Sequence, residues 1–208
     1  MIRILFIIST ICLTVSVSNA QQFSAAVKGG ISTSQISGDN LSGYNKAGFM
    51  AGALVSLPLS EKFDLAMEIM YIEKGSRRQS DPENGDYEYY RLRLNYIEIP
   101  VMFRWNFSKR FTFEAGPAIG VLLKESEEDE YGIINRSPER PFNKTEYGIA
   151  GGMQVHFAKK FSFIARIESS LIAVREHESG ETYRFNRGQY NAVLSFALQY
   201  NFRKNKIE

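Results

Sequence analysis

The chain has 208 residues, 25 Lys and Arg against 23 Asp and Glu, a net charge of +2 and 44% hydrophobic residues. This length suits one domain, or one barrel of about eight strands at roughly 20 to 25 residues per strand and connection. The near-neutral charge gives no support to nucleic-acid binding. The single cysteine, Cys12, excludes a disulfide within the chain and a cysteine-based metal site.

Residues 1–20 predict a secretory signal peptide. An uncharged apolar run over residues 4–17 follows a basic start and precedes small residues that end at Ala20, where we expect cleavage. A transmembrane helix is the alternative, but the run is too short to span a bilayer and no stop-transfer charges follow it. The domain that remains, residues 21–208, has 24 basic and 23 acidic residues, no thiol and no apolar stretch of helix-spanning length. If it spans a membrane, it must do so as a barrel.

Eight segments alternate apolar with small or polar residues at every second position, which is the period of a β-strand with two different faces. In the fifth segment, for example, Phe111 and Phe113 occupy one face and Glu114 the other. The predicted strands cover residues 23–31, 49–59, 63–72, 89–105, 111–123, 146–157, 161–171 and 190–202.

The fourth predicted strand changes parity along its length. Leu92, Leu94 and Tyr96 share one face, whereas the apolar residues occupy odd positions from Ile97 onward. We predict a β-bulge near Tyr96, which would bring all these apolar residues onto one continuous face. Arg93 is then expected on the opposite, polar face.

The connections between strands alternate strictly between short and long. Four long polar connections cover residues 33–46, 75–88, 124–144 and 172–188. The three short turns share one plan: Leu59-Ser-Glu-Lys-Phe63, Phe107-Ser-Lys-Arg-Phe111 and Phe157-Ala-Lys-Lys-Phe161. Tight periplasmic turns and longer external loops are typical of outer-membrane barrels. The sequence therefore predicts an all-β fold, an eight-stranded antiparallel up-and-down transmembrane β-barrel in the bacterial outer membrane, with both termini periplasmic.

Aromatic residues are expected near both ends of this barrel. Phe63, Phe103, Trp105, Phe107, Phe111, Phe157, Phe161, Tyr200 and Phe202 lie near the short turns, and Tyr71, Tyr89, Tyr90, Tyr147 and Tyr190 near the long loops. Two aromatic girdles around an apolar face are typical of outer-membrane barrels. The alternative is a soluble lipocalin-like barrel with the apolar face turned inward, which would give no reason for aromatic residues to gather at both ends.

Three segments of the chain resemble the PorT-like outer-membrane β-barrel family of Gram-negative bacteria. They are YIEKGS at 71–76, LNYIEIP at 94–100 and GPAIGVLL at 116–123, and the resemblance extends over essentially all of residues 21–208. It implies an eight-stranded barrel in the outer membrane. Most members of that family have no assigned activity and the namesake is implicated in protein secretion, a role that no individual residue here carries over. The tail after Phe202 departs from barrels that end on the aromatic itself.

The polar faces of the strands are expected to line a lumen that is filled by side chains, because eight strands enclose too little space for an aqueous pore. Buried charges must be paired, so the first interpretation is a structural network of ion pairs that closes the barrel. The alternative is a gated proton or ion path. The residues predicted for this network are Glu68, Arg93, Glu98, Arg104, Glu114, Glu146, Arg166 and Glu168.

The sequence predicts no catalytic residues, no cofactor and no metal site. His156 is expected in the lumen near the short turns and His177 in the last loop, so a shared metal site or a His-based triad is not expected. Ser169, Ser170 and Ser179 lie near His177 in the sequence, which raises a lipid-modifying barrel enzyme as an alternative. No nucleophile elbow accompanies them.

Charged residues in the long loops offer contacts outside the barrel. The acidic run at 125–130 could hold Ca²⁺ or bridge to lipopolysaccharide, and Arg77, Arg78, Arg175 and Arg184 could meet anionic sugar-phosphates, but solvated loops are the simpler interpretation. The acidic run lacks the spacing of an EF-hand. We predict a monomeric barrel with a structural or interaction role, in contact with outer-membrane lipid and lipopolysaccharide, with envelope or secretion proteins as candidate loop partners. A component of a secretion or envelope-assembly apparatus is the alternative.

Overall fold

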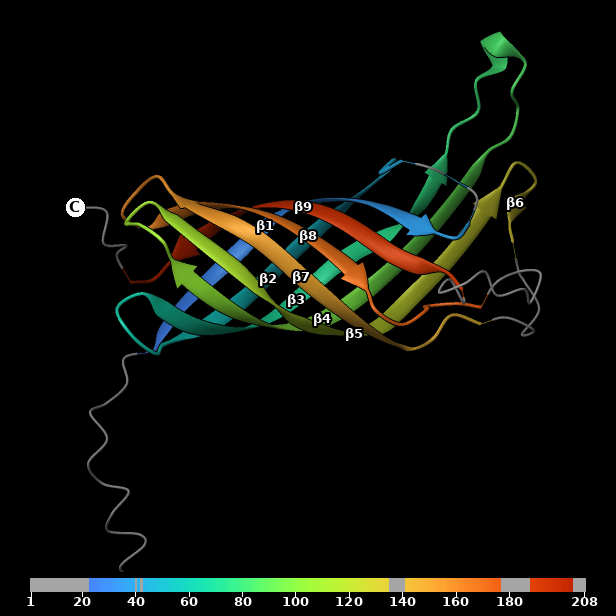
Figure 1. The fold of residues 1–208 in the computed structure, drawn as a ribbon. Coiled ribbons are helices and arrows are strands. Elements are labelled where there is room, and N and C mark those ends of the chain that lie inside the picture. Colours follow the sequence, from blue (N-terminus) through green and yellow to red (C-terminus); the bar gives the residue numbers. More distant parts are fainter. Residues whose placement is uncertain (1–22, 40, 42, 135–140, 177–187, 204–208) are drawn as a thin grey trace, which may run out of the picture.

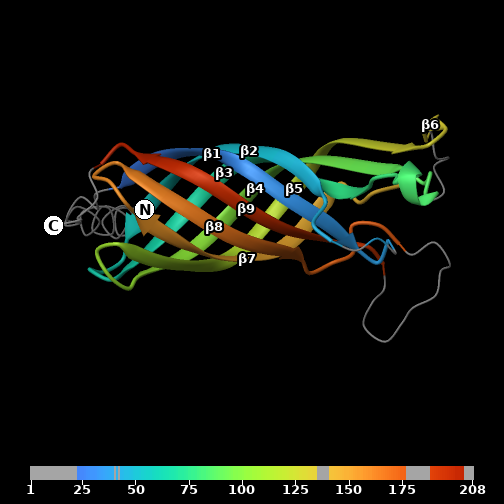
Figure 2. The same ribbon diagram turned by 90° about the horizontal axis from the view of Figure 1, so that it is seen from above.

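The computed structural model describes residues 23–39, 41, 43–134, 141–176 and 188–203. Within these residues one antiparallel sheet closes on itself as a barrel (Figures 1 and 2). Neighbours in sequence pair throughout, and β1 pairs with β9 to close the ring. The predicted eight-stranded up-and-down barrel is confirmed. Its strands are β1 (Ser24–Ser37), β2 (Lys46–Pro58), β3 (Phe63–Arg78), β4 (Tyr90–Asn106), β5 (Phe111–Asp129), β7 (Thr145–His156), β8 (Phe161–Ser170) and β9 (Tyr190–Asn201).

Two short elements accompany the barrel strands. The two-residue strand β6 (Gly132–Ile133) pairs with the outer end of β5, and the 3-10 turn η1 (Pro82–Asn84) lies between β3 and β4. No helix within the described ranges is long and apolar enough to cross a membrane.

The apolar face of the sheet points outward. Side chains such as Phe49, Ile69 and Ile119 are 49–70% exposed, although they belong to central parts of their strands. Large apolar side chains exposed all round a barrel need a lipid environment. The lipocalin-like alternative is therefore wrong, because it requires the opposite face to be outside.

An aromatic belt surrounds the short-turn end of the barrel. Ring centroids lie 5.3 Å apart in the pairs Phe63–Phe103 and Phe161–Tyr200, and Trp105 packs against Phe107 at the same distance. Trp and Tyr rings, here Trp105 and Tyr200, are favoured at membrane interfaces because each carries one polar group, and the Phe rings pack beside them. The belt therefore marks the level of one interface.

The repeated short turns use one hydrogen-bonding plan. The hydroxyl of Ser60 accepts from the backbone N–H groups of Lys62 and Phe63, and the hydroxyl of Ser108 accepts in the same way from Arg110 and Phe111. Serine is favoured in such turns because its side chain satisfies backbone donors locally.

Three strands run further toward the loop end than the alternation predicted. β1 continues to Ser37, β3 to Arg78 and β5 to Asp129. The ladder persists beyond the apolar region, for example at Arg77↔Arg91 and Arg91↔Glu128. Figure 1 shows β3, β4 and β5 projecting past the barrel on the loop side. We call these outer parts, residues 73–78, 90–95 and 124–129, the projecting sheet.

The bulge near Tyr96 exists, but its effect differs from the prediction. The register shifts between Asn95↔Lys124 and Tyr96↔Leu122, so the extra residue is Leu123 on β5. β4 itself keeps its parity, and even-numbered residues from Leu92 to Arg104 all point inward. Leu92, Leu94 and Tyr96 therefore fill the lumen instead of facing lipid, each with 0% exposure.

The described ends of the chain lie together at the short-turn end. Ser24 opens β1 opposite Ser56, and the backbone N–H of Phe202, just after β9, donates to the carbonyl of Ala25. The predicted signal peptide falls in residues 1–22, outside the described residues.

Candidate functional site

A balanced ion network occupies the part of the lumen nearer the short turns. It comprises Lys28 on β1, Glu68 on β3, Glu114 on β5 and Arg166 on β8, and we call it the turn-side network. Arg166 donates to both oxygens of Glu68 at 2.9 and 3.0 Å and to Oε1 of Glu114 at 2.9 and 2.6 Å. Lys28 Nζ lies 2.5 Å from Glu68 Oε2. Two cations meet two carboxylates, all with side chains 1–2% exposed.

A second network lies closer to the loop end and is not balanced. Lys74 Nζ on β3 lies 2.5 Å from Glu98 Oε1 on β4, 2.5 Å from Glu168 Oε1 on β8 and 3.2 Å from Glu146 Oε1 on β7. Side-chain exposure is 0–5% for all four residues. We call these residues the loop-side network. One ammonium group faces three carboxyl groups.

Neutral polar groups support one of these carboxyls. The Ser170 hydroxyl donates to Glu146 Oε1 at 2.6 Å, and Asn191 Nδ2 donates to Glu146 Oε2 at 3.0 Å. The Lys74 ammonium also lies 5.3 Å from the centre of the Tyr96 ring. Cation–π attraction of this kind adds to the stabilisation of a desolvated ammonium.

An apolar cluster closes the lumen toward the loop end. Ile36, Leu92 and Leu94 extend from the strands and meet Phe142 and Val174 from the loops, all with 0–7% exposure. Because these side chains pack above the loop-side network, its charges are separated from the outer solvent by apolar atoms.

A third polar group occupies the short-turn end of the lumen. Arg104 binds Asp64, with its Nε 3.0 Å from Oδ2. The His156 ring lies between the hydroxyls of Thr112, at 3.0 Å, and Ser162, at 2.8 Å. His156 thus lies where the sequence placed it, whereas His177 falls outside the described residues.

Most residues predicted for the lumen point into it. Glu68, Glu98, Glu114, Glu146, Arg166 and Glu168 form the two networks, and Arg104 pairs with Asp64 at the turn end. The prediction that Arg93 faces the lumen was wrong. Its side chain is 42% exposed and lies 3.9 Å from Glu128 on the outside of the projecting sheet, because β4 does not change parity at Tyr96.

Sequence reasoning missed the two lysines on which both networks depend. Lys28 shares the inward parity of Ala26, and this signal was present in the alternation of the first strand. Lys74 was missed because the third strand was expected to end at Ile72, before the apolar pattern stops. Strand parity counted two residues further would have placed it inward.

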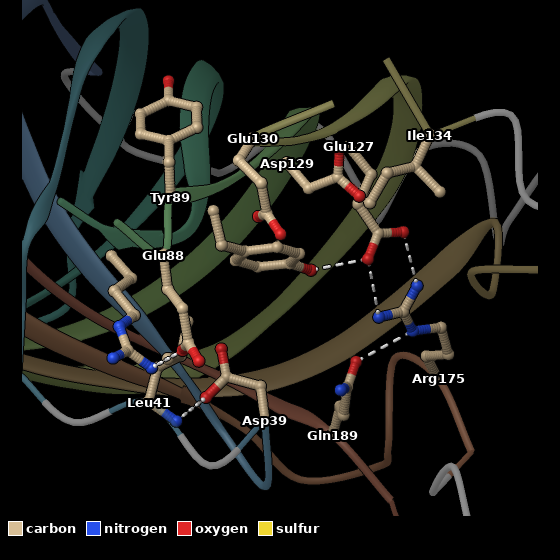
Figure 3. A pocket seen from close by; sticks show the side chains of 12 residues that line it. Asp39, Leu41, Glu88, Tyr89, Glu127, Asp129, Glu130, Ile134, Arg175 and Gln189 are labelled. Atoms are coloured by element: carbon tan, nitrogen blue, oxygen red, sulfur yellow. Dashed lines mark hydrogen bonds and ion pairs between the residues drawn. The ribbon is translucent and has the colours of Figure 1, made fainter. Parts of the chain in front are cut away.

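A pocket of about 340 Å³ opens among the loops (Figure 3). Arg175 donates to Glu127 Oε2 at 3.0 Å and to Gln189 Oε1 at 2.9 Å, and the Tyr90 hydroxyl donates to Glu127 at 2.6 Å. Glu127 is only 8% exposed, so the expectation that the whole acidic run is solvated is wrong. The remaining lining residues are Asp39, Leu41, Arg78, Glu88, Tyr89, Asp129, Glu130 and Ile134.

Burial raises the pKa of the Asp39 carboxyl above its usual value. The hydrogen bond from Arg78, by contrast, lowers the pKa of the exposed Asp86 carboxyl. No group of three or more His, Cys, Asp or Glu side chains in the described part of the chain is arranged to hold a metal ion.

A closed eight-stranded barrel with an apolar outer face, an aromatic belt and a filled lumen defines an outer-membrane barrel protein. The chain belongs to the outer membrane protein beta-barrel domain family, whose model matches residues 19–176. No curated protein matches its sequence.

Solved structures show the same fold at low sequence identity. Neisserial surface protein A is 12% identical with a TM-score of 0.55, and the match covers 87% of this chain and 99% of that chain. Ail, the attachment invasion locus protein of Yersinia pestis, solved in complex with the heparin analogue sucrose octasulfate, is 11% identical with a TM-score of 0.51 and the same coverage.

Proposed function

We propose that this outer-membrane barrel is a closed scaffold with a structural or interaction role, which neither conducts ions nor catalyses a reaction. The observation that carries the proposal is the filling of the lumen. Bonded charges occupy its middle, apolar side chains its loop end, and the Arg104–Asp64 pair its turn end. A lumen filled in this way leaves no continuous water path.

The same filling disfavours a lipid-modifying enzyme. Ser162 and His156 form the Ser–His contact of the described lumen, but Ser162 is 0% exposed. A nucleophile must reach its substrate, and this hydroxyl is enclosed by the barrel.

Conductance across planar bilayers tests the closed lumen. Wild-type protein and the variants Arg104→Met and Arg166→Met are compared under the same voltage. A structural network predicts that both variants lose stability without opening a defined conductance. A gated path predicts a reproducible change in conductance in a stably folded variant, and this result would overturn the proposal.

The projecting sheet is the part of the scaffold that we propose for external contacts. It carries both basic and acidic residues beyond the apolar zone, including Arg77, Arg91 and Glu128. Charges of both signs suit lipopolysaccharide and its divalent ions as well as envelope proteins. In this arrangement the loops face outward, both termini are periplasmic, and the barrel is a monomer.

Labelling of intact cells tests this orientation. Glu83→Cys lies in η1 at the tip of the β3–β4 connection, and Lys109→Cys lies in a short turn as its matched control. We expect a membrane-impermeant maleimide to label the first variant on intact cells and the second only after the outer membrane is opened. The reverse pattern would contradict the orientation.

Crosslinking from the β3–β4 connection, which joins two strands of the projecting sheet, then identifies what this region contacts. A photoreactive residue at Tyr87, which is 70% exposed, is expected to capture lipopolysaccharide or an envelope protein. Capture of a defined set of secretion proteins would favour the secretion role that the PorT-like resemblance implies. If the probe at Tyr87 captures no more than a control probe placed at Lys109, the proposed interaction role is contradicted.

A further inference from the structure

The loop-side network has more buried negative groups than its surroundings can neutralise. The three carboxyls of Glu98, Glu146 and Glu168 face the single ammonium of Lys74, whereas the neighbouring turn-side network is complete in itself. If every carboxyl were ionised, two negative charges would remain uncompensated among residues with 0–5% side-chain exposure. An uncompensated buried charge costs several kcal/mol even after relaxation of the protein, so the network must take up positive charge from solution.

An unpartnered polar atom marks where this charge is missing. Glu98 Oε2 has no hydrogen-bond partner within the described chain, although Glu98 is 1% exposed and its other oxygen contacts Lys74. An ionised carboxylate needs donors at both oxygens, whereas a protonated one carries its own. The site therefore fits a carboxylic acid better than a carboxylate.

Among the residues that the structure describes, the groups facing this site from each strand leave no other source of positive charge. β5 contributes Gly120, at which a Cβ atom would lie 3.2 Å from Glu98 Cγ, so no further side chain enters from that side. The next cations are already committed: Arg166 and Lys28 to the turn-side network, and Lys46 on β2 to Glu73 at 3.6 Å. The groups that face the network are Lys74, Tyr96, Glu98, Glu146, Glu168, Ser170 and Asn191.

We propose that the loop-side network is a proton-binding site, in which the Glu98 carboxyl is held as a carboxylic acid in the folded barrel. The proton stands on Oε2, the Glu98 oxygen to which no group in the described chain donates, whereas Glu146 accepts hydrogen bonds from Ser170 and Asn191 on its two oxygens. The proton is the cation that fits, because the described residues contain no carboxylate group arranged to hold a metal ion. This inference does not depend on the external role proposed above.

The proposal fixes the direction of the pH dependence. The unfolded chain ionises this carboxyl above about pH 5, so the folded barrel binds one more proton than the unfolded chain. A folded state that binds more protons loses stability as pH rises. The stabilisation is complete at acidic pH and is lost as the folded barrel releases this proton.

Urea unfolding in detergent micelles measures this dependence on the whole barrel. Between about pH 6 and about pH 9, the unfolding constant of the wild type is expected to rise by up to about 10-fold per pH unit, the signature of one proton. Glu98→Gln carries a neutral side chain that does not titrate, so this dependence on pH is expected to disappear.

Asp64→Asn is the matched control, because it makes the same chemical change in a balanced pair at the turn end. It is expected to lose stability while keeping the wild-type slope. An equal loss of slope in Asp64→Asn and Glu98→Gln would assign the pH dependence to buried carboxylates in general and overturn the assignment to this site.

Infrared spectroscopy detects the proton directly. At neutral pH the folded wild type is expected to show the carbonyl stretch of a protonated carboxylic acid, and Glu98→Gln is expected to lack it. Absence of this band at neutral pH would overturn the proposal, as would stability that follows the concentration of a metal ion at fixed pH instead of the pH itself.

Discussion

The two ion networks of the lumen each join glutamates to basic side chains at inward-facing strand positions, yet they differ in charge. The turn-side network matches two cations to two carboxylates and uses the planar fork of Arg166, which binds a carboxylate through two hydrogen bonds. The loop-side network uses the point charge of Lys74, which meets three carboxyls. Two equally buried networks can therefore behave differently. The balance of charge decides whether a network is neutral by itself or depends on a bound proton.

Removal of the central cation of the balanced network is expected to have the largest effect on stability. Arg166→Met leaves Glu68 with Lys28 alone and Glu114 without its cation. We expect a loss of about 3–5 kcal/mol in the free energy of unfolding, because it strands a buried carboxylate. Urea unfolding measures it, with the exposed Lys62→Met as control, expected within about 0.5 kcal/mol of wild type. A loss below about 1 kcal/mol in Arg166→Met would mean that the network does not stabilise the barrel.

The backbone next to Lys74 provides a second, geometric way to disturb the loop-side network. Gly75 has a φ of 137°, and a Cβ there would lie 2.1 Å from the carbonyl oxygen of Leu92. Gly75→Ala is expected to cost about 3 kcal/mol through backbone strain and displacement of β4. Gly85→Ala is the control, because its φ is also positive but nothing lies within 4 Å; it is expected to cost about 1 kcal/mol. Equal losses in the two variants would contradict the steric explanation.

Removal of Lys74 tests whether the stability of the unbalanced network depends on pH in a way that the balanced network does not. In Lys74→Met the three carboxyls no longer face a cation, so an ionised Glu98 would have no partner among the described residues for either oxygen. We expect a loss of about 1–3 kcal/mol at acidic pH from the lost hydrogen bonds, increasing with pH. Unfolding at a series of pH values measures this. A loss as large as that of Arg166→Met and independent of pH would show that the two networks stabilise in the same way.

The short turns lie outside both networks, and substitutions in them are expected to change the free energy of unfolding least. Ser60→Ala and Ser108→Ala each remove a hydroxyl that accepts two backbone N–H groups. Each is expected to cost about 0.5–1 kcal/mol, and the double variant the sum of the two, because the turns are separate. The third turn has Ala158 at this position, so these losses are tolerated in the fold. Strong non-additivity in the double variant would contradict independent turns.

Strand number, strand order and the outward apolar face could be predicted from the sequence because period-two alternation and short turns are local signals. The strand ends could not, since β3 and β5 continue through Lys74 and Glu127, where polar residues on both faces hide the period. Leu92 and Leu94 were assigned to the wrong face because apolar residues fill the loop end of this lumen as well as cover its outside. The unequal charge of the two networks could not be predicted without placing Lys28 and Lys74 in the lumen. In addition, contacts across the barrel join residues 72 to 98 positions apart in the sequence, which local patterns do not reveal.

The pairing of β1 with β9 from Ala26↔Asn201 to Ser37↔Tyr190 makes the last strand the one that completes the ring. Before that strand is in place, β1 and β8 each present an edge of unpaired N–H and C=O groups, and hydrocarbon offers these groups no partner. A half-built ring is therefore not a resting state in the bilayer. Until the seam forms, the lumenal carboxylates and cations of an open sheet remain accessible to water. Seam formation and desolvation of these charges are consequently a single event, in which the barrel acquires the proton of Glu98 and its last backbone hydrogen bonds together.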